Sequence, residues 1–247
     1  MRHAFDSQNE LGRLCDEVIY QNDLAARIAA AGLGPVHTEV PVTVTFRNFS
    51  KIYFLDLVVG SAAIYELKTA LKLIGEHDSQ LLNYLFLRGA YHGKLINFRP
   101  AQVESRFVNT GITPDVRKRF KIHTERWRDL DGPSRELREL FLGMLQDWGV
   151  FLELSLYTDA TMHFFGGEES VAQLVPITRN GIVLGNQRLH LLTPEIAFRV
   201  TAATDSPESY ERQLRSLLNL TPLRAMQWIN LNHHNIEFVT LEKTALK

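Results

Sequence analysis

The sequence predicts an α/β protein in which one unit of roughly 110 residues occurs twice. Three observations support this fold class. The 247 residues are 45% hydrophobic and 22% charged, which suits one large globular domain or two small ones. Helix-like and strand-like segments follow each other in the same order in both halves. Polar residues in the two halves are also separated by the same intervals along the chain.

The first half begins with a predicted helix over 10–31, where apolar residues recur with a period of about 3.6 until Gly32. A second helix over 75–88 carries leucines on one side and is capped by Gly89. Runs rich in β-branched and aromatic residues predict five strands, which are Glu39–Phe46, Ile52–Val59, Ala62–Lys68, Lys94–Phe98 and Glu104–Asn109.

Residues 113–135 interrupt this pattern with prolines, and we predict a basic, partly helical linker there. Between Arg117 and Arg128 the stretch contains Lys and Arg residues but a single acid, Glu125. It is either a solvated charged face or a strap that faces phosphate. In the second case the candidate substrate-binding residues are Arg117, Lys118 and Arg119.

The second half repeats the order of elements. Helices are predicted over 136–156 and 206–218. The strand-like runs are Val171–Ile177, Gly181–Leu184, Gln187–Leu192, Ile196–Ala202, Met226–Leu231 and Ile236–Leu241. The predicted domains are therefore residues 1–112 and 136–247.

Spacing supports an internal repeat. Lys68, Gln80 and Asn97 are separated by 12 and 17 residues. The same intervals separate three residues of the second half, which are Thr201, Gln213 and Asn230. Because such coincidences rarely stay in register by chance, we interpret the chain as a tandem duplication.

The chemistry is expected at Asp56, Glu66 and Lys68, which lie in two otherwise apolar strand-like runs. Side chains alternate along a strand, so Glu66 and Lys68 share a face. A buried carboxylate is costly unless it is paired or metal-bound, and two converging carboxylates repel each other. A divalent cation removes both penalties, and hard oxygen ligands favour Mg²⁺ or Mn²⁺ over zinc. The alternative is an exposed cross-strand pair of Glu66 with Lys68.

At these residues the sequence resembles the PD-(D/E)XK nuclease superfamily. Residues 10–110 resemble more closely its GxxExxY group, a bacterial branch. Five blocks carry the resemblance in order, namely Leu11-Gly12 with Glu17 and Tyr20, Asp56–Val59, Tyr65–Lys68, His77–Leu85 and Gly93–Phe98. One departure is Leu55, where the superfamily usually has an acidic residue or proline.

The resemblance implies a restriction-endonuclease-like core, with a mixed central sheet flanked by helices, and a metal-dependent nuclease. Asp56, Glu66 and the backbone carbonyl of Leu67 would hold the metal, which activates water. Lys68 would orient that water or neutralise charge in the transition state. Among the accessory residues, Glu17 would be a ligand through water or a ligand of a second metal, and Gln80 would hydrogen-bond the water or hold Lys68 in place. Tyr20 and Tyr84 would line the site.

Several of these residues have structural alternatives. Glu17 can be a solvated helix residue and Gln80 a packing residue, and each tyrosine can belong to the core. We interpret the remaining reactive side chains as structural, which applies to Cys15, His77 and the turn residues His233 and His234.

The second copy lacks the central carboxylates. In the predicted alignment Glu153 corresponds to Glu17, and His190 falls at the Asp56 position. The other pairs place Arg199 at Glu66, Thr201 at Lys68 and Gln213 at Gln80. A guanidinium repels a divalent cation, so we predict a degenerate domain that binds no Mg²⁺. It would stabilise the first copy as an internal pseudo-dimer or position nucleic acid.

We therefore expect a Mg²⁺- or Mn²⁺-dependent nuclease that acts on nucleic acid, with DNA as the expected substrate. The alternatives are a weakly catalytic binding module that keeps the fold, and an enzyme that uses the same metal site on another phosphate ester. Because Lys plus Arg is 27 against 28 acids, binding needs a local basic patch or a metal. A single cysteine excludes a disulfide or cysteine-rich metal site within the chain. The sequence predicts no membrane segment or signal peptide, so we expect a cytoplasmic protein that can also form homo-oligomers.

Overall fold

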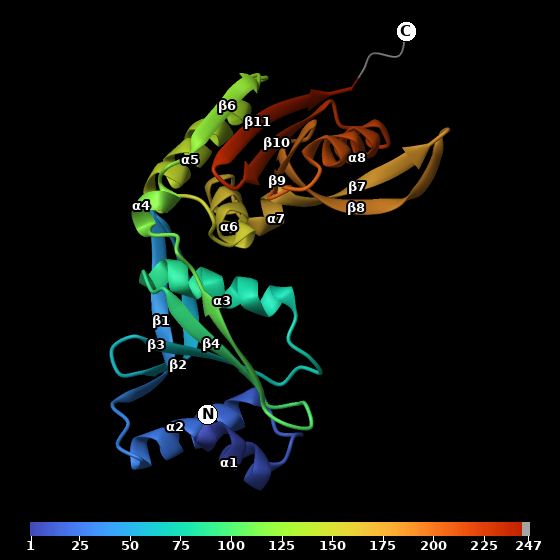
Figure 1. Cartoon of the computed structure of the whole chain (residues 1–247). Helices are drawn as coiled ribbons and strands as arrows, with labels where there is room; N and C mark the ends of the chain where they lie inside the picture. The colour runs from blue at the N-terminus through green and yellow to red at the C-terminus, as the bar shows by residue number, and fades with distance from the viewer. Residues whose placement is uncertain (244–247) are drawn as a thin grey trace. The chain divides into compact units, whose positions relative to one another are not determined.

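The computed structural model describes residues 1–243, which form two compact units. The first unit comprises Met1–Thr45 and Ser50–Pro114, and the second comprises Phe46–Phe49 and Asp115–Lys247. Each unit has one β-sheet with helices packed against it (Figure 1). This confirms the predicted α/β fold class. Within residues 1–243 no helix is long and apolar enough to cross a membrane.

The first unit contains a five-stranded sheet in the order β1-β2-β3-β4-β5. The pair β3–β4 is parallel, while β2–β3 and β4–β5 are antiparallel, so the sheet is mixed. The elements are α1 (Arg2–Leu11), α2 (Glu17–Ala30), β1 (Val36–Phe46), β2 (Phe49–Val59), β3 (Ala63–Lys68), α3 (Gly75–Arg88), β4 (His92–Asn97) and β5 (Glu104–Asn109).

The helix predicted over 10–31 is two helices in the structure. Helix α1 ends at Leu11 because Gly12 adopts φ 76°, a left-handed value that favours glycine. Helix α2 starts after Asp16, and the side chain of Leu14 in the connection is 82% exposed. The apolar residue that extended the predicted helix therefore faces solvent.

Helices cover both faces of the first sheet. On one face, buried strand residues such as Leu67 and Ile96 pack with Tyr20 and Leu24 of α2. Helix α3 covers the other face, where Gly93 lets Leu81 approach the sheet. A Cβ at Gly93 would lie 2.9 Å from a Leu81 methyl carbon, closer than packed atoms allow.

The second unit contains a six-stranded sheet in the order β6-β11-β10-β9-β8-β7. Parallel pairs are β9–β10 and β6–β11, whereas β7–β8, β8–β9 and β10–β11 are antiparallel. The elements are α4 (Pro114–Arg117), β6 (Lys121–Arg126), α5 (Gly132–Trp148), α6 (Leu154–Phe164), α7 (Glu168–Val171), β7 (Ala172–Arg179), β8 (Ile182–Thr193), β9 (Ile196–Thr201), α8 (Pro207–Asn219), β10 (Ala225–Asn232) and β11 (Asn235–Glu242).

Residues 113–135 are not the linker that we predicted. They contribute α4, the edge strand β6 and the first turn of α5. Asp131 caps α5 by accepting a hydrogen bond from the Ser134 amide at 2.8 Å. The helix predicted over 136–156 is also wrong, because it divides at Gly149 into α5 and α6.

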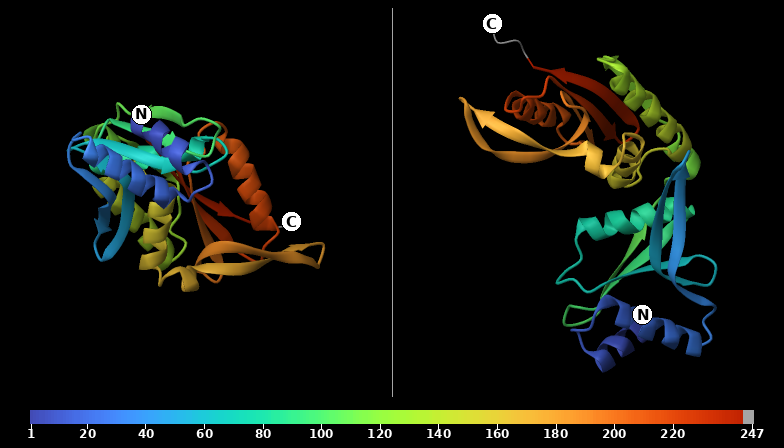
Figure 2. Two further views of the ribbon diagram at one scale, coloured as in Figure 1. Left: turned by 90° about the horizontal axis from the view of Figure 1, so that it is seen from below. Right: turned by 180° about the vertical axis from the view of Figure 1, so that it is seen from behind.

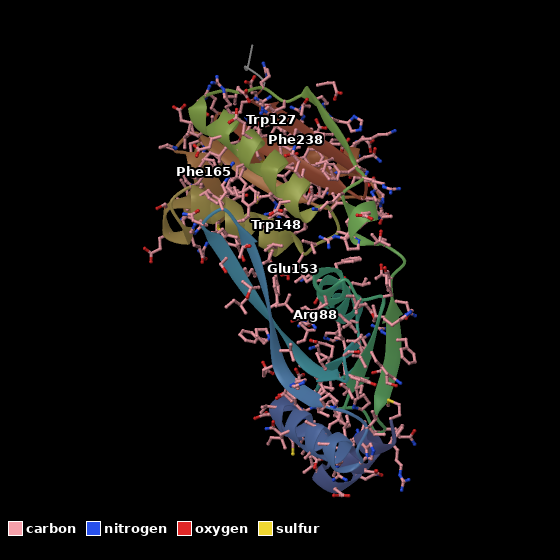
Figure 3. The ribbon with its side chains drawn as sticks, turned by 90° about the vertical axis from the view of Figure 1, so that its left-hand side faces the viewer. Arg88, Trp127, Trp148, Glu153, Phe165 and Phe238 are labelled. Atoms are coloured by element: carbon pink, nitrogen blue, oxygen red, sulfur yellow. The ribbon has the colours of Figure 1, made fainter. Side chains whose placement is uncertain are left out.

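The second sheet is likewise covered on both faces. Trp127 and Phe238 meet edge to face at 5.4 Å between ring centroids, and Phe141 of α5 reaches the same phenylalanine (Figure 3). Helix α8 lies along the sheet (Figure 2). Its Leu214 and Leu218 pack on the face that carries Val239, the neighbour of Phe238 in β11.

The helix junctions of the two units have the same geometry. Gly12 follows α1 with φ 76° and ψ −156°, and Gly149 follows α5 with φ 78° and ψ −158°. The Tyr20 hydroxyl donates to the Gly12 carbonyl at 2.7 Å, and the Tyr157 hydroxyl donates to the Gly149 carbonyl at 2.6 Å. Strands β7 to β11 with α8 also repeat the connections of β1 to β5 with α3. These matches support the predicted duplication.

Candidate metal centre and active site

Asp56 and Glu66 come together on the β2–β3 hairpin. Leu57 pairs with Tyr65, so the antiparallel register continued by one residue sets Asp56 opposite Glu66 on the same face. The backbone amide of Leu67 donates a 2.7 Å hydrogen bond to Oδ2 of Asp56. The Asp56 carboxylate therefore lies beside the Glu66-Leu67 backbone.

Glu66 is fully buried and only half satisfied. Its Oε1 accepts a 2.7 Å hydrogen bond from Nζ of Lys68, while Oε2 is buried without a hydrogen-bond partner among the described residues. Burial and the nearby Asp56 charge raise the pKa of Glu66 to about 8. Burial also raises the pKa of Asp56 to about 6, against the Leu67 hydrogen bond and the Lys68 charge. An extra positive charge between the two carboxylates would offset the cost of ionising both groups in this buried place.

These residues fit a hard divalent cation. The partnerless Oε2 of Glu66 is a ready ligand, and the Asp56 carboxylate lies on the same face. The Lys68 carbonyl accepts from the amide of Phe98, the residue after β4, so the alternating backbone turns the N–H and C=O of Leu67 toward β2 and Asp56. The Leu67 carbonyl is thus available as a third oxygen ligand, beside the carboxylates of Asp56 and Glu66. Within residues 1–243, no three His, Cys, Asp or Glu side chains form a metal-binding group, so the set depends on this carbonyl.

Lys68 and Glu17 lie at the edge of this centre. Nζ of Lys68 is 3.8 Å from Oε1 of Glu17 and 2.7 Å from Oε1 of Glu66. Burial lowers the pKa of Lys68, but the Glu66 and Glu17 charges outweigh it and raise the pKa overall. Burial raises the pKa of Glu17. Glu17 thus contacts the ammonium group, and the carboxylates that face each other are Asp56 and Glu66.

Gln80 and Tyr84 form a pair on α3. Nε2 of Gln80 donates a 3.0 Å hydrogen bond to the Tyr84 hydroxyl. Tyr84 is buried, which raises its pKa, and the Glu66 and Asp56 charges raise it further. Both carboxylate charges are thus felt at the Tyr84 hydroxyl, and a role of Tyr84 in lining the site stays a prediction. Within the described part of the chain, Gln80 makes no hydrogen bond to Lys68.

Tyr20 belongs to the core and not to the site. Its ring is fully buried and stacks on Phe98 at 4.4 Å between centroids. Its hydroxyl donates to the Gly12 carbonyl. The substrate contact that we predicted for Tyr20 is therefore wrong, because no part of the side chain reaches a surface.

The basic stretch does not form a continuous phosphate-binding strap. Arg117 is buried, and its guanidinium donates to the carbonyls of Val150 and Trp148, which corrects its predicted role. Two further arginines are paired with acids, Arg126 with Glu211 and Arg128 with Glu242. Lys118 and Arg119 are exposed and remain candidate contacts.

Two residues near the site were missed by sequence reasoning. Nε2 of Gln21 donates to the Asp56 carbonyl at 2.7 Å and to Oε1 of Glu39 at 2.6 Å. Gln21 fixes the backbone that carries Asp56, and Glu39 adds negative charge felt by Asp56 and Glu17. The spacing of Gln21, one helical turn after Glu17, could have identified it. No local pattern identifies Glu39, whose φ is 49°.

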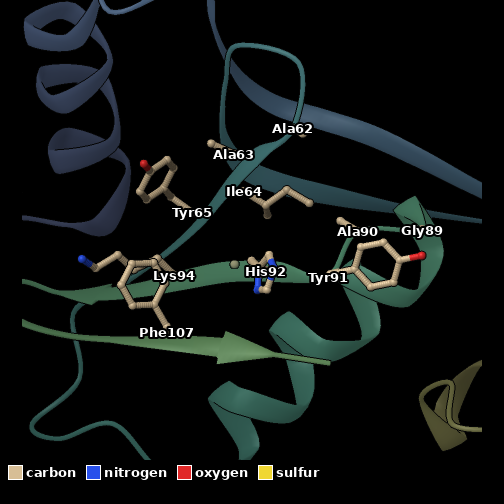
Figure 4. A pocket seen from close by; sticks show the side chains of 11 residues that line it. Ala62, Ala63, Ile64, Tyr65, Gly89, Ala90, Tyr91, His92, Lys94 and Phe107 are labelled. Atoms are coloured by element: carbon tan, nitrogen blue, oxygen red, sulfur yellow. The ribbon is translucent and has the colours of Figure 1, made fainter. Parts of the chain in front are cut away.

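A separate pocket of about 460 Å³ opens in the first unit. Figure 4 shows Tyr65, Lys94 and Phe107 side by side on neighbouring strands, with His92 further along β4. Nζ of Lys94 lies 4.5 Å from the Phe107 ring centroid, and Phe107 is 67% exposed. Alternation along β3 turns Tyr65 away from the face of Glu66, so this surface is not the carboxylate site.

The remaining candidates are structural. Nδ1 of His77 accepts from the Ile74 amide at the start of α3, and Cys15 contacts the Leu11 carbonyl. His233 and His234 form the turn between β10 and β11. All four were predicted to lack a catalytic role.

In the second unit the alignment shifts by one residue at two places. His190 pairs with Phe198 as Leu57 pairs with Tyr65, so His190 answers Leu57. Leu189, which is buried, therefore takes the Asp56 position. The interval of 133 residues that relates Lys68 to Thr201 gives the same assignment. Counted from the matching glycines, Glu153 likewise answers Asp16 and Leu154 answers Glu17, which corrects both predicted pairs.

A mixed sheet that presents two carboxylates and a lysine on adjacent strands is an arrangement suited to metal-assisted hydrolysis. Residues 1–108 match the family model described as the PD-(D/E)XK nuclease superfamily. Proteins of this superfamily are generally hydrolytic nucleases and typically use divalent metal ions, so the match suggests nuclease activity.

Two further comparisons add little. No curated protein shows a significant match to the chain. A solved structure titled "Crystal structure of SSO0001" is 21% identical over 43% of this chain, with a TM-score of 0.29. The match spans 60% of that protein's length.

Proposed function

We propose that the first unit is a Mg²⁺- or Mn²⁺-dependent nuclease that hydrolyses phosphodiester bonds of nucleic acid, with DNA as the expected substrate. The observation that carries the proposal is the buried, partnerless Oε2 of Glu66 beside the Asp56 carboxylate. A fold that had lost metal binding would leave this carboxyl with a cost and no function.

Asp56, Glu66 and the Leu67 carbonyl hold the cation in this proposal. When bound, the cation supplies a Lewis acid for the scissile phosphate and lowers the pKa of a water. Glu66 holds Lys68 in place through the 2.7 Å hydrogen bond. The Lys68 ammonium then donates to a non-bridging phosphate oxygen as negative charge develops there. Water attacks phosphorus, the 3′ oxygen leaves with a proton, and the products are a 5′-phosphate and a 3′-hydroxyl.

The finer parts of the proposal concern the family group and the second unit. Assignment to the GxxExxY group is supported by Glu17 of α2, whose Oε1 lies 3.8 Å from Nζ of Lys68. A degenerate second unit that binds no Mg²⁺ is supported by Leu189 and Arg199 at the positions of the two carboxylates. Residence in the cytoplasm and pairing of whole chains stay predictions from the sequence.

A cleavage assay distinguishes the proposed nuclease from the alternative, a binding module that retains the fold. Labelled DNA is incubated with the full chain and Mg²⁺ or Mn²⁺, and Lys68→Ala is compared with Lys72→Ala, an exposed lysine outside the centre. We expect Lys68→Ala to lose at least about 100-fold in rate and Lys72→Ala to match wild type. Equal rates in both variants, or no metal-dependent cleavage by the wild type, would contradict the nuclease assignment.

A further inference from the structure

A pocket of about 330 Å³ lies in the second unit between the sheet and α8. We call it the Arg199 pocket. Its polar lining residues come from β8, β9 and α8, and they are Gln187, Arg188, His190, Arg199, Tyr210 and Gln213. The eleven residues that line it include no carboxylate. The charged groups of the lining are therefore cationic, and apolar residues such as Leu189 and Phe198 form the rest of the wall.

The Arg199 pocket occupies the place that the metal centre has in the first unit. Arg199 pairs with Trp228 across β9–β10 as Glu66 pairs with Leu95 across β3–β4. Gln213 follows Arg199 on α8 by 14 residues, as Gln80 follows Glu66 on α3. The two sites thus share a scaffold, but a guanidinium replaces the buried carboxylate.

The guanidinium of Arg199 has unused donors. Among residues 1–243 it donates one hydrogen bond, to the Tyr210 hydroxyl at 3.3 Å, and it forms no ion pair. Arg188 is different, because it pairs with Glu168 at 2.7 Å. Burial and then the positive charges of Arg199 and Arg188 lower the pKa of His190, which agrees with an unbalanced positive potential.

The partners of Arg199 are held in place by packing. The Tyr210 ring stacks on Trp228 with 5.9 Å between centroids, and the indole of Trp228 donates to Thr201 at 2.8 Å. The Tyr210 hydroxyl is thereby fixed beside the guanidinium. The exposed guanidinium keeps its remaining N–H donors for a ligand, and their planar fork matches the geometry of a phosphate.

We propose that the Arg199 pocket binds a phosphate group of a nucleic-acid strand without a metal ion. Arg199 donates two parallel hydrogen bonds to non-bridging oxygens, and the Gln213 amide supplies a further donor from α8. The volume is near the lower end of small-ligand sites, which suits one nucleotide and not a duplex. The first unit would engage phosphate through a cation held by carboxylates, whereas the second engages it directly. This inference does not depend on catalysis by the first unit.

The test is binding of a fluorescent single-stranded DNA to the full chain in excess EDTA, measured by anisotropy. Arg199→Gln is compared with Arg179→Gln, which removes the same charge from an exposed arginine of β7 outside the pocket. We expect Arg199→Gln to weaken binding about tenfold and to lower the salt dependence by about one phosphate contact. Arg179→Gln should stay within about twofold of wild type.

Three further arms make the result decisive. Far-ultraviolet circular dichroism of both variants checks folding, and Arg199→Lys, which keeps the charge without the fork, should bind with intermediate affinity. EDTA removes any cation from the first unit, so this binding is measured without a metal-loaded carboxylate centre, and a failure of the nuclease proposal leaves this test intact. Competition by inorganic phosphate or AMP at micromolar concentration would identify a free-phosphate site and overturn the strand assignment. Equal affinity of the Arg199→Gln and Arg179→Gln variants would overturn the phosphate site.

Discussion

Asn97 and Asn230, which are 133 residues apart, share three side-chain hydrogen bonds in their two units. Oδ1 of Asn97 accepts from the Ala70 amide (3.0 Å). Nδ2 of Asn97 donates to the Ala70 carbonyl (2.8 Å) and to Oε2 of Glu104 (3.2 Å). Likewise, Oδ1 of Asn230 accepts from the Ala203 amide (2.8 Å), and Nδ2 donates to the Ala203 carbonyl (3.0 Å) and to Oε2 of Glu237 (3.0 Å). Asn97 ties the loop after β3 to β4, and Asn230 ties the loop after β9 to β10. In the first unit that loop follows Lys68, so this network positions the end of the candidate site.

Replacement of either asparagine should destabilise its own unit. Asn97→Ala and Asn230→Ala each leave the half-buried amide and carbonyl of Ala70 or Ala203 without a partner, at a cost of about 1–3 kcal/mol in the free energy of unfolding. Asn219→Ala, at an exposed position, should change it by less than about 0.5 kcal/mol. Hydrogen exchange of each sheet during urea titration measures the effect unit by unit. A loss below about 1 kcal/mol in both variants would show that the shared network is not a main support.

Stability of the metal-free first unit should fall as the pH rises from about 5 to 8. The pKa values of Asp56 and Glu66 are raised to about 6 and about 8, so the folded state binds more protons than the unfolded chain. A raised carboxyl pKa stabilises the fold at low pH, and this contribution is lost as pH increases. Groups with lowered carboxyl pKa values, such as Asp23, act at lower pH.

The measurement is the urea midpoint of the first unit in EDTA at several pH values. Asp56→Asn removes one of the two repelling charges, so it should flatten the profile and raise the midpoint at pH 8. A wild-type midpoint that rises between pH 5 and 8 would refute the mutual repulsion of the two carboxylates.

Gln80 and Tyr84 should act as one unit in catalysis. Tyr84→Phe removes the hydroxyl that accepts from Gln80, and Gln80→Ala removes the donor, so each should reduce kcat about tenfold. The double variant should be no slower than either single variant, because both changes break the same contact. Tyr91→Phe is the control, since Tyr91 is exposed away from the carboxylates. Additive losses in the double variant would argue against a shared role.

Arg117 should matter for folding and not for nucleic-acid binding. Arg117→Ala removes buried hydrogen bonds to two carbonyls of the α5–α6 connection, at a cost of about 2–4 kcal/mol in stability. Arg119→Ala, at an exposed position, is expected to stay within about 0.5 kcal/mol of wild type. Thermal unfolding of the three proteins tests this. If Arg117→Ala unfolds like wild type but binds DNA weakly, the stretch is a phosphate strap after all.

Local patterns predicted much of the first unit. Strands β2 and β3 and helix α3 were found because apolar runs and a capping glycine, Gly89, mark them in the sequence. The break after α1 was missed because it depends on the backbone of Gly12 and not on an apolar pattern. Strand β6 was missed because all six of its side chains are exposed and its partner, β11, is more than 100 residues away.

The candidate site was predictable only in part. Asp56 and Glu66 stood out because carboxylates are unusual in apolar strands. Tyr20 and Tyr84 could not be separated by helix spacing, since the face that each occupies depends on how α2 and α3 pack against the sheet. The assignment of Leu189 to the Asp56 position was predictable, since it follows from the interval of 133 residues that relates Lys68 to Thr201.

Titration of the full chain with Mn²⁺ by calorimetry tests the central claim most directly. The wild type should bind one Mn²⁺ in the first unit, while Glu66→Gln and Asp56→Asn each bind at least about tenfold more weakly. Lys72→Ala should bind like wild type. Wild-type protein that takes up no Mn²⁺, or unchanged affinity in both carboxylate variants, would contradict a metal centre at Asp56 and Glu66.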